Sequence, residues 1–106
     1  MKLITKAIQA KLDKNFAEHN DSDIPLKLFN ASGGQTWLIT QMEPDGDIMW
    51  GLCDLGFGCV EYGTVSLSEM LETQRQMGYR FMLERDLHWR GGKVEDFSDR
   101  DNLAGC

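Results

Sequence analysis

The spacing of apolar residues near the start of the chain predicts an amphipathic helix. Ile8, Leu12 and Phe16 recur at every fourth position within residues 5–19, which places them on one helical face. Thr5 precedes this pattern and is a suitable N-cap, because its hydroxyl can accept a hydrogen bond from a free backbone N–H. The turn-rich stretch that follows ends the helix before the first strand.

A second helix is predicted from its capping residues. Ser66 and Glu69 form the pattern of a capping box, in which Ser66 is the N-cap and Glu69 occupies the third helical position. The helix should run to about Met77, and Gly78 follows where a left-handed C-cap belongs.

Five segments are predicted to be strands because they are rich in alternating, β-branched or aromatic residues. They cover residues 26–29, 36–43, 48–55, 59–65 and 79–89. Short, glycine-rich connections favour antiparallel pairing. We therefore expect a single α+β domain, with an antiparallel, meander-like sheet of about five strands and two helices on one side. The domain should span residues 1–92, and residues 93–106 should form a polar C-terminal tail.

Two glycines interrupt adjacent predicted strands. Gly51 and Gly63 indicate a β-bulge or a close approach of a large neighbour at these positions.

The composition predicts a cytoplasmic protein. The N-terminal segment has lysines every few positions, which excludes a signal-peptide core, and the longest apolar cluster is only of strand length. The chain has an odd number of cysteines, Cys53, Cys59 and Cys106, and no two have the C-x-x-C spacing, so they indicate neither a disulfide framework nor a zinc site. We expect Cys53 and Cys59 to act as small buried hydrophobic residues, and we predict no metal and no cofactor.

Charge is distributed unevenly along the chain. The formal net charge is −6, yet the 47 residues from 28 to 74 contain no Lys, Arg or His. Seven carboxylates lie in this segment: Glu43, Asp45, Asp47, Asp54, Glu61, Glu69 and Glu72. Contact with a phosphate backbone needs clustered Lys and Arg, so this region disfavours nucleic acid and favours a basic protein partner.

The last predicted strand carries the best candidates for catalysis. Glu84, Asp86 and His88 alternate along it, so their side chains would share one face and could hold a metal ion or form an acid–base set. A charged, solvated face is the simpler reading, because ligands in a row on one strand converge poorly. Arg85 faces the apolar side, and a carboxylate such as Glu61 would be a suitable partner for it.

Trp37, Trp50 and Trp89 lie on three different predicted strands. Aromatic residues in a basic groove would indicate single-stranded nucleic acid. These residues are embedded in the acidic half of the chain, so packing in the core is the expected role.

Several motifs together resemble a known family, the bacterial domain-of-unknown-function family 2958. Residues 84–89 read Glu-Arg-Asp-Leu-His-Trp, and a preceding stretch reads Glu-x-Gly-x-x-Ser-Leu-x-Glu from Glu61 to Glu69. Further matching segments are Lys2-Leu3-Ile4-Thr5-Lys6, Thr36-Trp37 and Gly51-Leu52. Asp13 departs from the family pattern, which usually has proline there.

The resemblance implies a setting but no biochemical activity. Such proteins occur on plasmids, phages and other mobile genetic elements, often among anti-restriction or transfer genes. The leading hypothesis is a non-enzymatic, acidic binding protein that inhibits or modulates a basic nucleic-acid-binding protein of host defence, replication or transfer. One alternative is a small metal-dependent or acid–base enzyme that uses Glu84, Asp86 and His88. A further alternative is direct nucleic-acid binding through Lys2, Lys6, Lys11, Lys14 and the arginines.

Overall fold

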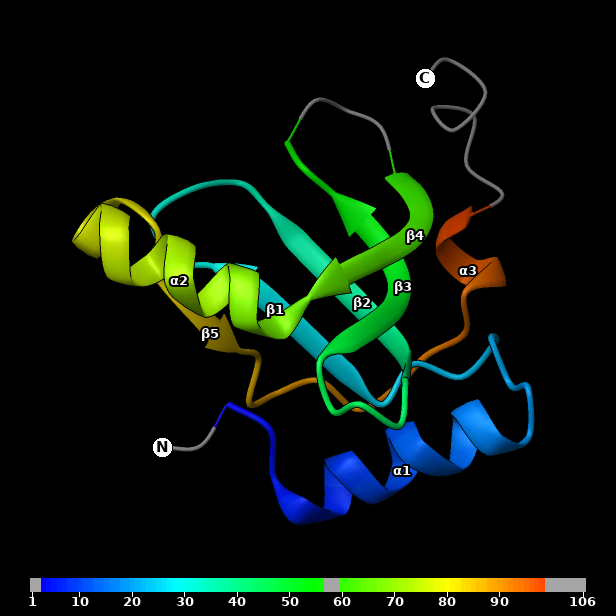
Figure 1. Ribbon diagram of the computed structural model, residues 1–106. Coiled ribbons are helices and arrows are strands. Elements are labelled where there is room, and N and C mark those ends of the chain that lie inside the picture. Colours follow the sequence, from blue (N-terminus) through cyan, green and yellow to red (C-terminus); the bar gives the residue numbers. More distant parts are fainter. Residues whose placement is uncertain (1–2, 57–59, 99–106) are drawn as a thin grey trace.

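The chain folds into one five-stranded antiparallel sheet with helices packed on it (Figure 1). The computed structural model describes residues 3–56 and 60–98. The strand order is β4-β3-β2-β1-β5, so the first four strands form a meander and β5 joins the sheet beside β1. The elements are α1 (Lys6–Ala17), β1 (Leu26–Asn30), β2 (Thr36–Met42), β3 (Ile48–Asp54), β4 (Val60–Ser66), α2 (Leu67–Met77), a 3₁₀ turn η1 (Gly78–Arg80), β5 (Leu83–Arg85) and α3 (Glu95–Ser98). The expected α+β class and the antiparallel meander are confirmed.

Helix α1 begins and ends as the sequence predicts. The hydroxyl oxygen of Thr5 accepts a hydrogen bond from the backbone N–H of Ile8 at 3.1 Å. Leu12 is completely buried against the sheet. The helix ends near His19, which adopts a left-handed conformation with φ of 54°. A buried polar contact fixes this end to the sheet, because the Asn15 side-chain amide donates to the carbonyl of Thr40 at 2.9 Å.

Helix α2 carries the predicted cap and a second cap that lies far away in the sequence. Ser66 Oγ accepts from the backbone N–H of Glu69 at 3.2 Å. Asp47, from the turn before β3, accepts from Ser66 Oγ at 2.8 Å and from the backbone N–H of Ser68 at 2.7 Å. These two bonds, the Ser68 bond first, hold the pKa of Asp47 below its ordinary value. Gly78 is the C-cap, as the sequence predicts, but its φ of 60° and ψ of −130° differ from the left-handed helical conformation that we expected.

A β-bulge in β2 explains one of the two strand glycines. The register between β2 and β3 shifts between Ile39 and Gln41. A side chain at Gly51 would place its Cβ 2.1 Å from the carbonyl oxygen of Leu38, so only glycine fits there. The expected close approach therefore exists at Gly51. Gly63 has open space around its Cβ position, so close packing does not explain that glycine.

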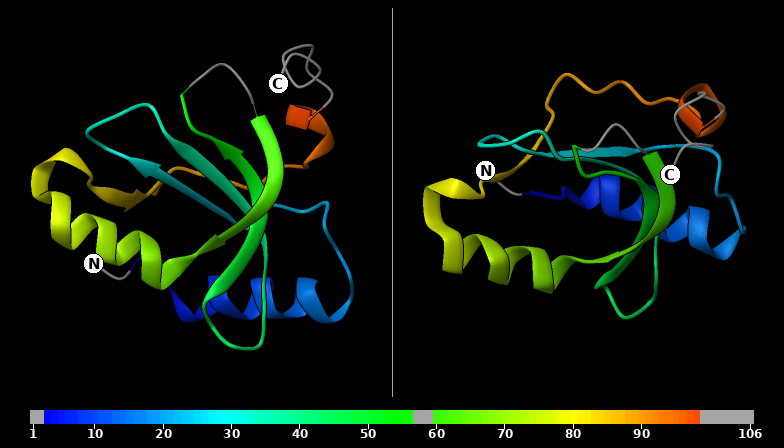
Figure 2. Two further views of the ribbon diagram at one scale, coloured as in Figure 1. Left: turned by 45° about the horizontal axis from the view of Figure 1, so that its top comes forward. Right: turned by 90° about the horizontal axis from the view of Figure 1, so that it is seen from above.

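The sheet has two unlike faces, and α1 and α2 cover one of them. This face buries nine side chains: Leu12, Leu26, Leu28, Trp37, Ile39, Met42, Met49, Met70 and Leu83. The opposite face buries Ile24, Leu38 and Leu52, and the C-terminal segment packs over them. Figure 2 shows α1 and α2 on one side of the sheet and the segment leading to α3 on the other.

The C-terminal segment is attached to the second face by hydrogen bonds and side chains. The indole N–H of Trp89 donates to the carbonyl of Ile24 at 2.8 Å, and the Trp89 ring lies 6.1 Å from that of Phe97. Val94 also packs on this cluster. Packed structure therefore continues past residue 92, where we placed the domain boundary, and residues 99–106 lie outside the described residues.

The strand predicted over residues 79–89 is wrong in length. Only Leu83–Arg85 form β5, because the chain first makes the 3₁₀ turn after Gly78. After Arg85 the carboxylate of Asp86 accepts from the backbone N–H of His88 at 2.9 Å, which turns the chain away from the sheet.

Of the three cysteines, the structure describes Cys53. Cys53 is half-buried against the larger cluster, and burial raises the pKa of its thiol. Cys59 and Cys106 lie outside the described residues.

Across the described part of the chain, no helix has both the length and the apolar character needed to span a bilayer.

Candidate functional site

The predicted set of Glu84, Asp86 and His88 does not share one strand face. Glu84 lies within β5, whereas Asp86 follows the strand and His88 lies in the turn beyond it. Because the strand ends at Arg85, the alternation on which the proposed grouping depends does not extend to His88. Among the described residues, no group of three or more His, Cys, Asp or Glu side chains is arranged to hold a metal ion.

Asp86 stabilises the turn that follows β5. Its carboxylate accepts from the His88 backbone and forms an ion pair with Lys27 at 3.3 Å. Both contacts lower the pKa of Asp86, the His88 hydrogen bond more strongly. The Lys27 amine also lies 5.8 Å from the centre of the Trp89 ring. The Glu-Arg-Asp-Leu-His-Trp motif thus turns the chain and anchors it across the second face.

Arg85 and Glu61 lie on opposite edge strands of the sheet. Arg85 lies opposite Leu28 on β1, so it points towards the face that α1 and α2 cover. Glu61 lies on β4, at the other edge of the sheet. Four strand spacings, about 19 Å, separate these edges.

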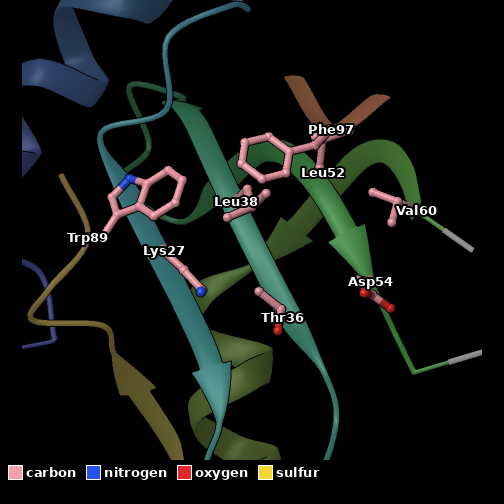
Figure 3. A pocket seen from close by; sticks show the side chains of 8 residues that line it. All are labelled: Lys27, Thr36, Leu38, Leu52, Asp54, Val60, Trp89 and Phe97. Carbon is pink, nitrogen blue, oxygen red and sulfur yellow. The ribbon is translucent and has the colours of Figure 1, made fainter. Parts of the chain in front are cut away.

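A first pocket lies beneath Trp89 on the second face (Figure 3). Its volume is about 230 Å³. The lining residues are Lys27, Thr36, Leu38, Leu52, Asp54, Val60, Trp89 and Phe97. The Lys27 amine and the Asp54 carboxylate bring opposite charges to it, and Asp86 already holds Lys27. The lining therefore shows no preference for a ligand of either charge.

The seven carboxylates of the acidic segment lie in separate places. Glu43, Asp45 and Asp47 belong to the turn between β2 and β3, and we call these three residues the acidic turn. Glu69 lies just beyond the Asp47 contact, in the first turn of α2. Asp54 and Glu61 lie at the opposite end of the β3–β4 hairpin, about 20 Å away along β3. Glu72 lies on α2, where Arg75 forms an ion pair with it.

The carboxylates of the acidic turn are held by neutral donors. Asp45 accepts from the backbone N–H groups of Asp47 and Ile48, at 2.8 and 3.1 Å. Asp47 accepts from the two serines that begin α2. Glu43 accepts from the indole N–H of Trp50 at 2.8 Å. These bonds fix the carboxylates in position, and none of these donors carries a positive charge.

A second pocket adjoins the acidic turn, and we call it the Trp50 pocket. It has a volume of about 300 Å³ and is lined by Phe16, His19, Asp21, Gln41, Glu43, Trp50 and Tyr62. The rings of Trp50 and Tyr62 are stacked, with centroids 6.3 Å apart and planes at 29°. Both rings lie on the second face, since Trp50 shares a side of β3 with Leu52 and Tyr62 lies opposite Leu52.

A hydrogen-bond chain fixes the Tyr62 ring. The hydroxyl of the fully buried Thr40 donates to the Trp50 carbonyl at 3.1 Å, and its oxygen lies 2.9 Å from the Tyr62 hydroxyl. Because Thr40 uses its only proton on the carbonyl, Tyr62 donates to Thr40. Burial raises the pKa of Tyr62, and the nearby negative charge of Asp21 raises it further.

Sequence reasoning found some of these residues and missed their arrangement. Core packing, expected for all three tryptophans, holds for Trp37, which is 5% exposed. Trp50 instead lines an open pocket and Trp89 anchors the C-terminal segment. Asp21 and His19 also line the Trp50 pocket. Their approach to Tyr62 depends on where α1 ends, and no local pattern reports that.

The positive residues also occupy separate places. Lys6, Lys11 and Lys14 are exposed along α1, whereas Arg75 and Arg80 lie at the end of α2 and just beyond it. Lys2 lies outside the described residues.

The fold and its pockets define a small α+β domain with one helix-covered face and one face that carries an acidic, aromatic pocket. The chain belongs to the family described as protein of unknown function (DUF2958), whose model matches residues 3–98. No curated protein and no solved structure matches the chain significantly.

Proposed function

We propose that this chain is a small acidic binding protein of a bacterial mobile genetic element that acts in the cytoplasm. It would dock through the acidic turn onto a basic protein that itself binds nucleic acid. By occupying the surface that phosphates would otherwise contact, it would inhibit or modulate that protein. Host defence, replication and transfer proteins are the classes that present such surfaces.

The observation that supports this proposal most is the segment of 47 residues without a positive charge. Three of its carboxylates form the acidic turn, within five residues of one another. Their partners are backbone N–H groups, serines and one indole, all of which are neutral. A fixed array of uncancelled charges needs little reorganisation when a cationic surface arrives.

Such an array affects the rate of association and its response to salt. Clustered charge steers an oppositely charged partner and raises the association rate at low ionic strength. Exposed charges are screened beyond about 8 Å at physiological ionic strength, so binding should weaken as salt is raised. The mobile-element setting is a further part of the proposal and rests on the contexts in which members of this family occur.

The test uses purified protein in two stages. The tagged chain captures proteins from a host extract, and proteins that elute at intermediate salt are identified and purified. Each is then titrated with the wild-type chain, with Asp45→Asn and with Asp54→Asn. Asparagine keeps an acceptor oxygen for the hydrogen bonds but removes one negative charge, so the two variants have the same net charge.

We expect a basic partner whose affinity for the chain falls as salt is raised. Asp45→Asn should weaken this affinity about threefold, and Asp54→Asn should hardly change it. A partner that is not basic would overturn it. Affinity that does not change with salt would overturn it as well.

A further inference from the structure

We propose that the Trp50 pocket receives an arginine side chain of the basic partner. This inference rests on the proposed function and adds a specific contact to it. The stacked rings of Trp50 and Tyr62 supply the aromatic surface, and Glu43 supplies the carboxylate beside it. Glu43 also belongs to the acidic turn, so one continuous surface joins the pocket to the proposed docking site.

The aromatic pair is open to solvent and already rigid. Tyr62 is 38% exposed, although its hydroxyl is tied to the buried Thr40. Trp50 is half-buried, and its N–H is tied to Glu43. A guanidinium group prefers to stack on the face of a Trp or Tyr ring. Because both rings are fixed beforehand, little conformational entropy would be lost when a cation binds.

Negative charge at the pocket selects the sign of the ligand. Glu43 contributes one carboxylate to the wall, and Asp21, from the loop between α1 and β1, contributes another. Asp21 and Tyr62 line the same pocket, so this carboxylate lies near the aromatic surface. Phosphates and other anions would therefore be repelled, and an uncharged apolar group would leave the negative charge of both carboxylates uncompensated.

Arginine fits this arrangement better than lysine. A carboxylate can accept about four hydrogen bonds, so Glu43 keeps acceptor capacity after it accepts from Trp50. The planar guanidinium can donate to Glu43 while its face lies on an aromatic ring, whereas an ammonium group is a compact, strongly hydrated charge. The pocket volume of about 300 Å³ has room for a single extended side chain.

The experiment follows the indole N–H signals of the isotope-labelled protein by two-dimensional NMR. A blocked arginine-rich peptide and a lysine-rich peptide of the same charge and length are titrated in turn at low salt. The signal of Trp50 is identified by its loss in the Trp50→Phe variant. Trp37 and Trp89 provide internal controls, because one is buried in the larger cluster and the other is bonded to Ile24.

The expected result is a saturable shift of the Trp50 signal with the arginine peptide, while the signals of Trp37 and Trp89 hardly move. The lysine peptide should bind about fivefold more weakly. Glu43→Gln, which can still accept from Trp50, should weaken the arginine peptide about fivefold. Tyr62→Leu removes the ring and should weaken it about two- to fivefold. Asp54→Asn should change it by less than about twofold, because that site lies about 20 Å away along β3, out of reach of a side chain bound in the pocket.

The outcomes separate this inference from the proposed function. If the arginine peptide binds with strong salt dependence but the Trp50 signal does not shift, the pocket assignment is overturned and acidic docking remains. Equal losses in Glu43→Gln and Asp54→Asn would lead to the same conclusion. If neither peptide binds at low salt, both the pocket and the acidic docking surface are overturned. The spectrum of each variant also shows whether it is folded.

Discussion

Beneath α1 and α2, nine apolar side chains of the described residues form one buried cluster, whereas the cluster on the opposite face of the sheet contains three buried apolar side chains. The first face is covered by two helices. The second is covered by one extended segment that Trp89 and Phe97 hold in place, and both the Trp50 pocket and the pocket beneath Trp89 open on it. The first face therefore contributes the larger buried cluster, and the second face carries the two pockets described above.

The largest expected difference between the faces is the cost of removing a leucine. Leu28 is fully buried under the helices, and Leu28→Ala should lower the free energy of unfolding by about 3–4 kcal/mol. Leu52 is 1% exposed but adjoins an existing pocket, so Leu52→Ala loses fewer packing contacts and should cost about 2 kcal/mol. Urea denaturation of the two variants measures the difference. Equal costs would contradict the contrast between the faces.

A second pair of variants tests how closely the strands approach under the helices. Gly51→Ala forces backbone to move, because its Cβ would lie 2.1 Å from the Leu38 carbonyl, and should cost about 2 kcal/mol or more. Gly63 is paired with Gly51 across the hairpin but has open space, so Gly63→Ala should be neutral or slightly stabilising. Thermal melting of both variants decides this. A neutral Gly51→Ala would show that the bulge can relax.

Two tryptophans of the second face should respond differently to the same substitution. Trp89→Phe removes the donor to the buried Ile24 carbonyl and should lower the free energy of unfolding by about 1 kcal/mol. Trp50→Phe frees Glu43, which is half-exposed and can bind water instead, so the cost should stay below about 0.5 kcal/mol. Chemical denaturation gives both values. A larger loss for Trp50→Phe would assign Trp50 a structural role.

The smallest effect concerns acid and the Asp47 cap. The folded state lowers the pKa of Asp47 below 3.8, so the cap stabilises the protein fully above that ordinary value. This contribution is lost as the pH falls through the lower, folded pKa. Asp47→Asn does not titrate at this site, so its stability should fall less steeply below pH 3.8 than that of the wild type. Denaturation midpoints across this range measure the slopes, and parallel curves would contradict the prediction.

Local signals in the sequence predicted most of the fold. The apolar repeat from Ile8, the Ser66 capping box and the turn residues between strands each act over a few residues. The helices and turns that they form can therefore be predicted without the tertiary structure. The strand predicted over residues 79–89 is too long, because alternation continues on both sides of Leu83–Arg85 while the turn at Gly78 and the Asp86 hydrogen bond interrupt the strand.

The candidate site was harder to predict because its contacts join distant parts of the chain. Asp47 caps a helix that begins 20 residues later, and Trp89 bonds to a residue 65 positions earlier. The acidic segment was recognisable from composition alone. Its division between the two ends of the β3–β4 hairpin depends on strand register, which charge does not determine.

The two edge strands differ in length, and this difference affects which edge of the sheet could pair with a second copy of the protein. β5 has three residues, so that border of the sheet offers few free backbone groups for another strand. β4 has seven residues and forms the longer border, where Glu61 is exposed. Each copy carries a net charge of −6, so two copies that approach along β4 repel one another. The same charge that would attract a cationic partner would thus oppose pairing of two copies along β4.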